Sequence, residues 1–168
     1  MDEKDFKQVY DIMEEAFPKA ERRPFERQKK LLLNKKYKLH VRRDNDGRII
    51  GFMAVWVFET FCFLEHLAVR KSCRGQKTGE KMMKEFFKTL DIPVFFEVEA
   101  PDTEIARRRI DFYKRLGCVY NPFGYMQPIL WEGAQSVALK IMSYPNALDE
   151  KTFKSWKEQV FKEVYCKL

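Results

Sequence analysis

The central segment of this chain, Phe61–Phe87, reads FCFLEHLAVRKSCRGQKTGEKMMKEFF and joins the pattern of a strand to the pattern of a helix. Its first part is a run of apolar, aromatic and branched residues, which is typical of a strand. Apolar residues then recur at positions 82, 83, 86, 87 and 90, which is the spacing of one helix face. The loop between them, Arg74–Gly79, contains two glycines and two cations. Because a helix begins directly after this loop, several backbone N–H groups point the same way, and the loop is a candidate anion-binding site.

Two common phosphate-binding motifs do not fit this loop. A Walker loop has four residues between its glycines and then Lys-Ser or Lys-Thr, whereas three residues separate Gly75 from Gly79 and Glu80-Lys81 follows. The dinucleotide pattern G-x-G-x-x-G is absent as well. The loop does fit Arg/Gln-x-x-Gly-x-Gly/Ala, with Lys77 in place of the first glycine. Together with the preceding strand, 64–69, it resembles the pyrophosphate-binding motif of the GNAT family of N-acetyltransferases. A solvent-exposed turn between a strand and a helix is the alternative interpretation.

A second motif extends this resemblance. Residues 105–118, IARRRIDFYKRLGC, are similar to the second cofactor motif of the family, in which a tyrosine precedes a helix-ending glycine. These two positions are Tyr113 and Gly117 here, whereas Ala106 replaces the asparagine often found before that tyrosine. The matches cover residues 48–120, with a weaker similarity to about residue 145. Two motifs in the right order, separated by one strand, are more specific than either one alone.

The periodicity of the whole chain predicts one α/β (α+β) domain, residues 1–168. Helical spacing occurs at 2–17, 24–33, 78–90 and 103–116, and Asp149 can cap a last helix. Strand patterns occur at 37–41, 48–58, 61–69, 94–100, 118–120 and 137–142, with a loop expected at 122–128. This order resembles the GNAT fold, a mixed and mostly antiparallel central sheet flanked by helices. The strand that usually opens the family's fold is absent.

The composition narrows the class of protein. At 45% apolar and 34% charged residues, the chain has the balance of a soluble globular protein, and it has neither a membrane-span pattern nor a signal peptide. The four cysteines are far apart and there are only two histidines, so we expect no metal site and a reducing, cytoplasmic setting. The net charge of +7 comes from basic residues interleaved with acidic ones, and no nucleic-acid-binding motif accompanies them. We therefore expect no nucleic-acid or membrane partner.

The resemblance implies an activity and a cofactor site. A GNAT protein transfers an acyl group from acetyl-CoA to a primary amine by direct transfer within a ternary complex. The acceptor would be a small-molecule or peptide amine, and the protein a monomer or a homodimer. The alternative is a non-catalytic CoA-binding domain with a regulatory or interaction role, which the departures at Lys77 and Ala106 keep open. The residues expected to bind CoA are Leu67, Ala68 and Val69 on the strand, then Arg74, Gly75, Gln76, Lys77, Thr78 and Gly79 in the loop.

The chemistry of amine acylation suggests the catalytic residues. An amine with a pKa of about 10.4 must lose a proton before it attacks, so a base is needed nearby. Glu65 is the first candidate, because strand alternation puts it on the face of Leu67 and Val69; Glu97, Glu99 or a water are the alternatives. By resemblance, the backbone N–H of Val69 or Leu67 polarises the thioester carbonyl, and Tyr113 protonates the departing thiolate.

Several other side chains are given structural interpretations. Tyr113 has the alternative of packing in the core. His66 points away from the face of Glu65 and is expected to be buried and hydrogen-bonded. Cys73 lies beside the loop but has no histidine partner near it in sequence, so we expect no covalent role for it. The aromatic-rich segments 56–58 and 121–131 are expected to line the acceptor pocket.

Overall fold

Six strands form one central sheet in the computed structural model, which describes residues 1–129 and 136–165. The order across the sheet is β1-β2-β3-β4-β6-β5. Only β3 and β4 are parallel, and every other neighbouring pair is antiparallel. The prediction of a mixed, mostly antiparallel sheet is therefore confirmed. The bounds are β1 Tyr37–Arg43, β2 Ile49–Val57, β3 Cys62–Val69, β4 Val94–Glu99, β5 Val119–Gln127 and β6 Val137–Tyr144.

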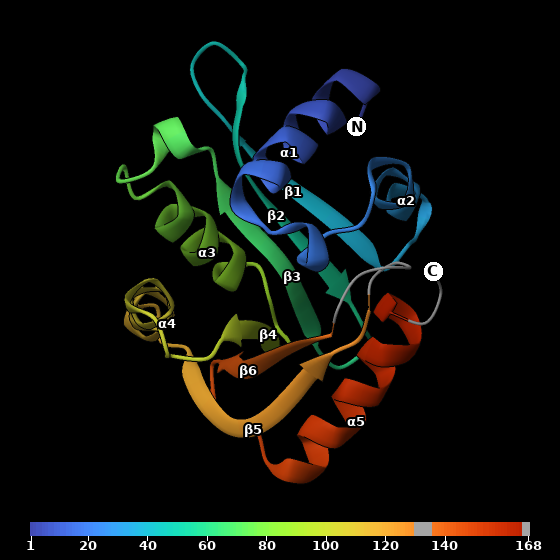
Figure 1. The fold of residues 1–168 in the computed structure, drawn as a ribbon, viewed down its shortest axis with the longest axis vertical. Helices are drawn as coiled ribbons and strands as arrows, with labels where there is room; N and C mark the ends of the chain where they lie inside the picture. The colour runs from blue at the N-terminus through green and yellow to red at the C-terminus, as the bar shows by residue number, and fades with distance from the viewer. Residues whose placement is uncertain (130–135, 166–168) are drawn as a thin grey trace.

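Helices cover both faces of this sheet (Figure 1). The chain begins with a helix, as predicted, and Asp2, Thr103 and Asp149 each accept a backbone N–H at a helix N-terminus. No helix among the residues that the structure describes is long and apolar enough to cross a membrane. The bounds are α1 Glu3–Ala16, α2 Phe25–Lys30, α3 Thr78–Lys88, α4 Glu104–Arg115 and α5 Glu150–Val160, the last continued by a π-helical turn, Phe161–Tyr165.

The core has two parts, one on each face of the sheet. On the α1/α5 face, buried aromatic side chains from both helices meet the sheet, and the rings of Phe61 and Trp156 stack at 4.7 Å. On the α3/α4 face, Met83 and Phe86 of α3 and Ile110 of α4 pack against alternate residues of the same strands. Burial of this apolar area on both faces is the main stabilising contribution to the fold.

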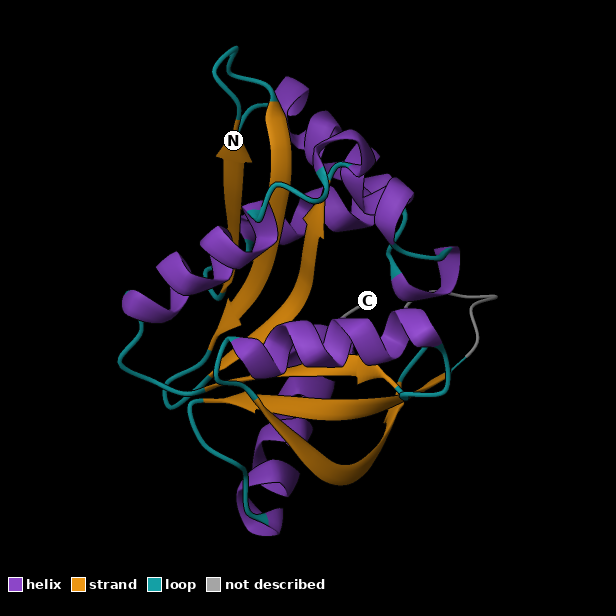
Figure 2. Ribbon diagram, turned by 90° about the vertical axis from the view of Figure 1, so that its left-hand side faces the viewer, coloured by secondary structure: helices purple, strands orange, loops and turns teal. Residues whose placement is uncertain are grey.

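The sheet opens between β3 and β4. Their pairing covers only three register pairs and ends at Leu64 and Phe96. Beyond that point the strands diverge, and in Figure 2 β1, β2 and β3 run up the view while the other strands run across it. The backbone of both strands past this point therefore borders a gap rather than a neighbouring strand.

A β-bulge at Glu65 lies directly beside this opening. Ala54 pairs with His66 and Val55 pairs with Leu64, so Glu65 is an extra residue without a partner on β2. The bulge reverses the alternation of β3. Glu65 therefore shares the α1/α5 face with Trp56, to which it is hydrogen-bonded, whereas Leu67 packs on the α3/α4 face. The expectation that Glu65 shares a face with Leu67 and Val69 is wrong, because simple alternation does not allow for the inserted residue.

The expected loop at 122–128 is a second difference. In the structure β5 continues to Gln127, and the register shifts between Asn121 and Tyr125. Pro122 has no N–H to donate to a ladder, so the strand bulges there and resumes pairing at Tyr125. Buried and exposed side chains alternate at residues 125–127, but Tyr125, Met126 and Gln127 have no apolar–polar alternation, so this strand was not visible in the sequence. Because β5 continues to residue 127, Gln127 lies at the opening of the sheet.

Candidate active site

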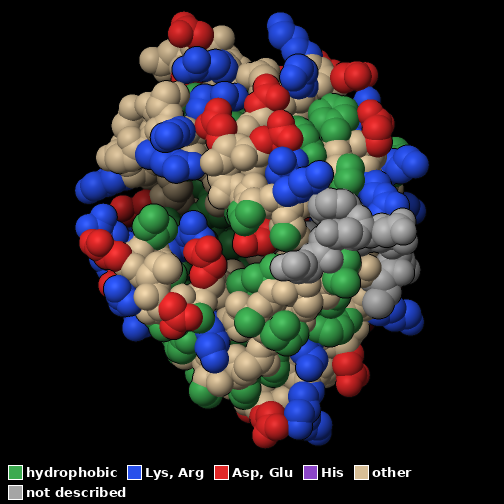
Figure 3. Space-filling model, in the orientation of Figure 1, with side chains coloured by type: hydrophobic (Ala, Val, Ile, Leu, Met, Phe, Trp, Pro, Cys, Tyr) green, Lys and Arg blue, Asp and Glu red, His purple; other side chains and the backbone are tan. Residues whose placement is uncertain are grey.

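A cavity of about 380 Å³ occupies the opening between β3 and β4. Residues 64–69 and 96–99 form its two walls, and the end of α1, the turn Lys19–Glu21 and α4 close its sides. In the space-filling view of Figure 3 the surface is hollowed near its centre, with hydrophobic and acidic side chains in the hollow. The fold therefore brings the two segments singled out by the sequence, the β3–α3 region and α4, to one cavity.

Two backbone N–H groups of β3 point into this cavity. The N–H of Arg70 donates to the carbonyl oxygen of Ile50 at 2.8 Å, so it faces β2. Because successive N–H groups of a strand point to opposite sides, those of Val69 and Leu67 face away from β2, toward the opening. Both residues line the cavity. The site thus has donors aimed at a bound group without help from any side chain.

The loop before α3 leaves further backbone donors free. No side chain caps the N-terminus of α3, so its first N–H groups are available to an anion. Gly75 has φ 82° and Lys77 has φ 58°, and both lie in the left-handed region. This conformation explains why a glycine suits position 77, since a side chain there carries a steric cost. Nearby, Nε of Arg74 donates to the carbonyl oxygen of Val69 at 3.1 Å.

The predicted cofactor residues fall into three groups. Leu67, Ala68, Val69, Arg74 and Gly79 line the cavity. Gln76 and Thr78 line a neighbouring groove, together with Lys81 and with Arg42 of β1, and Gly75 and Lys77 form the turn between the two. A Cβ atom at Gly79 would lie 3.7 Å from Val69 Cγ2, an ordinary contact, so the protein itself does not require glycine there.

Glu65 lies in the cavity wall, but both of its carboxylate oxygens are occupied. Oε1 forms an ion pair with Arg23, and Oε2 accepts a hydrogen bond from Nε1 of Trp56 at 2.8 Å. The side chain is only 3% exposed. Burial alone would raise the pKa of Glu65, but the charge of Arg23 and the hydrogen bond from Trp56 hold this pKa below its usual value. Glu65 is thus a poor proton acceptor.

Arg23 joins three distant parts of the chain. Its guanidinium is fully buried, binds Glu65 on β3 and donates to the carbonyl oxygen of Val164 at 2.7 Å. Arg23 itself lies between α1 and α2. Nothing in the local sequence distinguishes this arginine from the many exposed ones, so its role was not predictable from the sequence.

Glu97, on β4, is in a different environment. Tyr165 donates to Oε1 at 2.8 Å and Gln127 donates to Oε2 at 3.0 Å, and both donors are neutral. Burial raises the pKa of Glu97 to about 7, against the effect of these hydrogen bonds. Within the described ranges no cation pairs with it. By contrast, Glu99 forms an ion pair with Arg109 of α4 at 2.7 Å, and both side chains are partly exposed.

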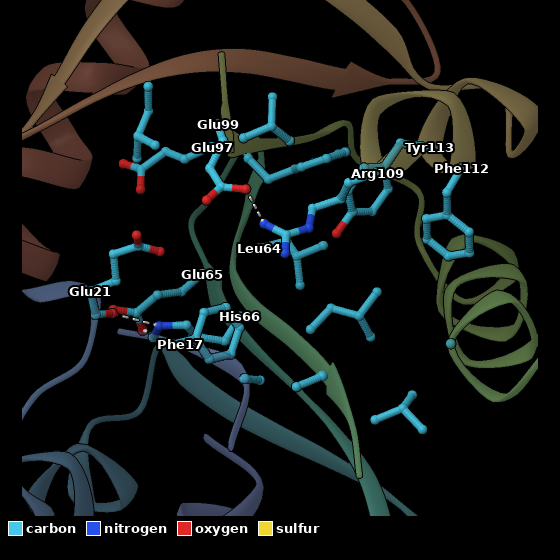
Figure 4. Close-up of a pocket in the computed structure, with 18 of the residues that line it drawn as sticks. Phe17, Glu21, Leu64, Glu65, His66, Glu97, Glu99, Arg109, Phe112 and Tyr113 are labelled. Carbon is cyan, nitrogen blue, oxygen red and sulfur yellow. Dashed lines mark hydrogen bonds and ion pairs between the residues drawn. The ribbon is translucent and has the colours of Figure 1, made fainter. Parts of the chain in front are cut away.

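Tyr113, on α4, lines the cavity on the side of the cofactor loop. Its ring packs against Phe96 with centroids 4.5 Å apart, and Figure 4 shows its hydroxyl pointing into the cavity beside Arg109. Burial raises the pKa of Tyr113 to about 12. The residue therefore belongs to the core through its ring and to the cavity through its oxygen, which combines the two interpretations of the sequence.

His66 is buried and hydrogen-bonded, as predicted, but because of the bulge it lies on the same α1/α5 face as Glu65, against the ring of Phe17, and not on the opposite face. Nε2 lies 3.1 Å from the carbonyl oxygen of Glu21, and because a carbonyl can only accept, Nε2 carries the proton. Burial lowers the pKa of His66, so the ring is neutral near pH 7 and Nδ1 holds a lone pair. Nδ1 has no hydrogen-bond partner in the described structure.

The expected acceptor lining is only partly present. Residues 56–58 do not line the cavity, and of 121–129 only Gln127 does so. Residues 130 and 131 lie outside the described part of the chain. Among residues 1–129 and 136–165, no group of three or more His, Cys, Asp or Glu side chains could hold a metal ion.

Comparison with known proteins agrees with this geometry. The family profile described as "Acetyltransferase (GNAT) domain" matches residues 35–117. No curated protein sequence matches. Among solved structures, a GNAT-family protein from Bacteroides thetaiotaomicron superposes with a TM-score of 0.87 at 29% identity, over 95% of this chain and 91% of that chain.

Two more distant structures share the fold. The ribosomal-protein-S18-alanine N-acetyltransferase from Escherichia coli superposes with a TM-score of 0.62 at 18% identity, covering 90% of this chain and 94% of that one. An aminoglycoside 6'-N-acetyltransferase complexed with coenzyme A gives 0.59 at 15% identity, with 82% and 88% covered.

Proposed function

This chain belongs to the GNAT family of N-acetyltransferases, and from that membership we propose that it transfers an acetyl group from acetyl-CoA to a primary amine within a ternary complex. The observation that carries the proposal is the cavity itself. It is bordered by the free N-terminus of α3, the inward N–H groups of Leu67 and Val69, and the side chains of Glu97 and Tyr113.

Acetyl-CoA suits the part of the cavity beside the N-terminus of α3 and the open edge of β3. The backbone N–H groups that begin α3, with Arg74 beside them, suit the two charges of a pyrophosphate. The open edge of β3 offers N–H groups to the amide oxygens and to the thioester carbonyl, where negative charge develops during transfer. Acetyl-CoA supplies an activated thioester at this position.

Glu97, rather than Glu65, is the base in this proposal. A base must accept a proton near pH 7, and the pKa of Glu97 is about 7, whereas that of Glu65 lies below its usual value. Glu65 is also committed to Arg23 and Trp56. Glu99 is committed to Arg109 in the same way.

The protons can be followed through the transfer. The acceptor enters as an ammonium ion, whose pKa falls as it leaves water. Its nitrogen loses two protons overall as the N–C bond forms and the C–S bond breaks. Glu97 takes one of them and releases it to water, and the other ends on the sulfur, which leaves with the bonding electron pair. Tyr113 donates a hydrogen bond to this sulfur. The pKa of Tyr113 is about 12 and that of a thiol is about 8.5, so Tyr113 holds its proton more tightly than the thiol does. Tyr113 therefore stabilises the thiolate by a hydrogen bond and keeps its own proton.

The test is thiol release from acetyl-CoA with a set of amines, followed against pH. For the parent we expect kcat to fall below about pH 7, because Glu97 must be ionised to act and is half protonated at its pKa of about 7. Glu97→Gln should lower kcat by about 10²- to 10⁴-fold and abolish this acid limb. Glu65→Gln should lower stability but leave the midpoint of the limb in place. A midpoint that moves only in Glu65→Gln would transfer the role to Glu65, and thiol release from no amine would refute the activity.

A further inference from the structure

We propose that the acceptor carries a second positive charge, as in an alkyl diamine or a longer polyamine, and that Glu21 binds this second charge. The inference rests on the proposed function and adds the chemical class of the acceptor. It comes from the balance of charges and of hydrogen-bonding groups around the cavity between β3 and β4.

Five carboxylates line this cavity, and three of them are paired with a cation. Those three pairs are Glu15 with Arg70, Glu65 with Arg23 and Glu99 with Arg109. The other two, Glu21 and Glu97, have no cationic partner in the part of the chain that the structure describes. The remaining cation of the lining, Arg74, lies at the cofactor loop. The part of the cavity away from the cofactor loop, where the acceptor would bind, is therefore negatively charged, although the net charge of the protein is +7.

Glu21 is suited to meet a ligand. It lies in the short turn after α1, is more than half buried, and Figure 4 shows its side chain pointing into the cavity. Burial raises the pKa of Glu21, and so does the charge of Glu99, while Arg109 acts in the opposite direction. A bound cation would remove the cost of keeping this carboxylate ionised there.

The hydrogen-bonding groups point to the same class of ligand. His66 lines the same cavity, and its Nδ1 is a buried lone pair without a hydrogen-bond partner, 4.0 Å from Oε2 of Glu65. The neutral donors on the opposite wall, Gln127 and Tyr165, already donate to Glu97. The side chains of Glu21 and His66 thus leave acceptors without donors on this side of the cavity, and a ligand rich in N–H groups can satisfy them.

The positions of the two carboxylates indicate how such a ligand would lie. Glu97 is on β4 and Glu21 is on the opposite wall, beside His66 (Figure 4). The apolar side chains of Leu64, Phe96 and Leu139 also line the cavity and can pack against methylene groups. One amine would meet Glu97 and react, and the second would remain charged at Glu21.

The test uses monoamines and diamines of equal chain length, n-butylamine with 1,4-diaminobutane and n-hexylamine with 1,6-diaminohexane. A hydrogen bond between charged groups contributes about 1.5–3 kcal/mol, so we expect the parent to favour the diamine of one pair by about 10- to 100-fold in kcat/KM. Glu21→Gln should remove this preference by raising KM for the diamine more than KM for the monoamine. Glu26→Gln, an equal charge change at an exposed position of α2, should keep the preference.

Calorimetry with 1,6-diaminohexane gives a readout that does not depend on turnover. Binding should be at least about tenfold weaker in Glu21→Gln than in the parent or in Glu26→Gln. Equal kcat/KM for monoamines and diamines in the parent, or a preference that survives Glu21→Gln, would overturn the inference while leaving the proposed activity intact. If no amine releases thiol, the proposed activity fails, and the calorimetric comparison alone then decides whether the cavity selects dications.

Discussion

At the scale of single residues, Lys77 has a backbone conformation that its side chain opposes. A left-handed conformation costs a residue with a Cβ atom about 1–2 kcal/mol, and Lys77 has φ 58° and ψ 18°. We expect Lys77→Gly to be more stable than Lys77→Ala by about 1 kcal/mol, because both lose the charge and only glycine relieves the strain. Urea unfolding measures the difference. Equal stabilities would mean that the loop relaxes around any residue.

The same pair of variants separates strain from charge in cofactor binding. If the ammonium of Lys77 contributes to the phosphate site, both variants should bind CoA more weakly than the parent and to a similar extent. If the parent binds CoA no better than either variant, a lysine at position 77 gives no gain in CoA affinity that offsets the backbone strain.

Tyr113 offers a direct test of a catalytic hydroxyl. Its oxygen has no hydrogen-bond partner among the described residues, so Tyr113→Phe should fold with an unchanged melting temperature. Loss of the donor to the leaving sulfur should lower kcat by about 10²-fold, with CoA affinity nearly unchanged. Tyr120→Phe removes a hydroxyl outside the cavity and is the matched control. A kcat equal to the parent's would leave Tyr113 with a packing role alone.

At the scale of elements, the loop between β3 and α3 combines backbone donors with the exposed cations Lys71, Arg74 and Lys77, of which Arg74 lines the cavity. Arg74→Ala removes a charged hydrogen-bond donor worth about 1.5–3 kcal/mol, so CoA should bind about 10- to 100-fold more weakly while stability changes little. Arg108→Ala, at a solvent-exposed position of α4, is the control. An unchanged CoA affinity in Arg74→Ala would remove this side chain from the cofactor site.

The elements themselves were largely predictable from local patterns. The strand-loop-helix segment from β3 to α3, the cap at Asp149 and the antiparallel order of the first three strands follow from periodicity and turn chemistry. The bulge at Glu65 and the irregular β5 did not, because each is decided by the register with a neighbouring strand. One inserted residue was enough to separate Glu65 from the face of Leu67 and Val69, which was the sequence argument for choosing Glu65 as the base.

The hydrogen-bond partners of Glu97 were not predictable from local sequence either, because they lie far from it along the chain. Glu97 was one of three candidate carboxylates in the sequence, and nothing local separates it from Glu99. What separates them is Tyr165 and Gln127, which lie 68 and 30 positions away along the chain. Hydrogen bonds over such separations are set by tertiary packing alone, so the sequence could nominate the three carboxylates but not choose between them.

At the scale of the whole molecule, Arg23 connects the segment between α1 and α2 to β3 through Glu65 and to the last described turn through Val164. Arg23→Met would leave Glu65 buried without its counter-ion, which typically costs about 3–5 kcal/mol. We expect the double variant Arg23→Met/Glu65→Gln to regain much of this loss, since glutamine needs no counter-ion and still accepts from Trp56. Urea unfolding of the two single variants and the double variant measures the coupling. Additive losses would show that the pair contributes little beyond packing.

The contacts of Val164 and Tyr165 also bear on how the protein matures during translation. Both residues belong to the last described turn, yet one accepts from Arg23 and the other donates to Glu97. Arg23 and Glu97 emerge from the ribosome long before these partners do. Until the turn is synthesised, a nascent chain holds this guanidinium and this carboxyl group without these two hydrogen bonds. Catalytic competence should therefore appear only once residues 164 and 165 have been synthesised, and a chain released before residue 164 would lack it.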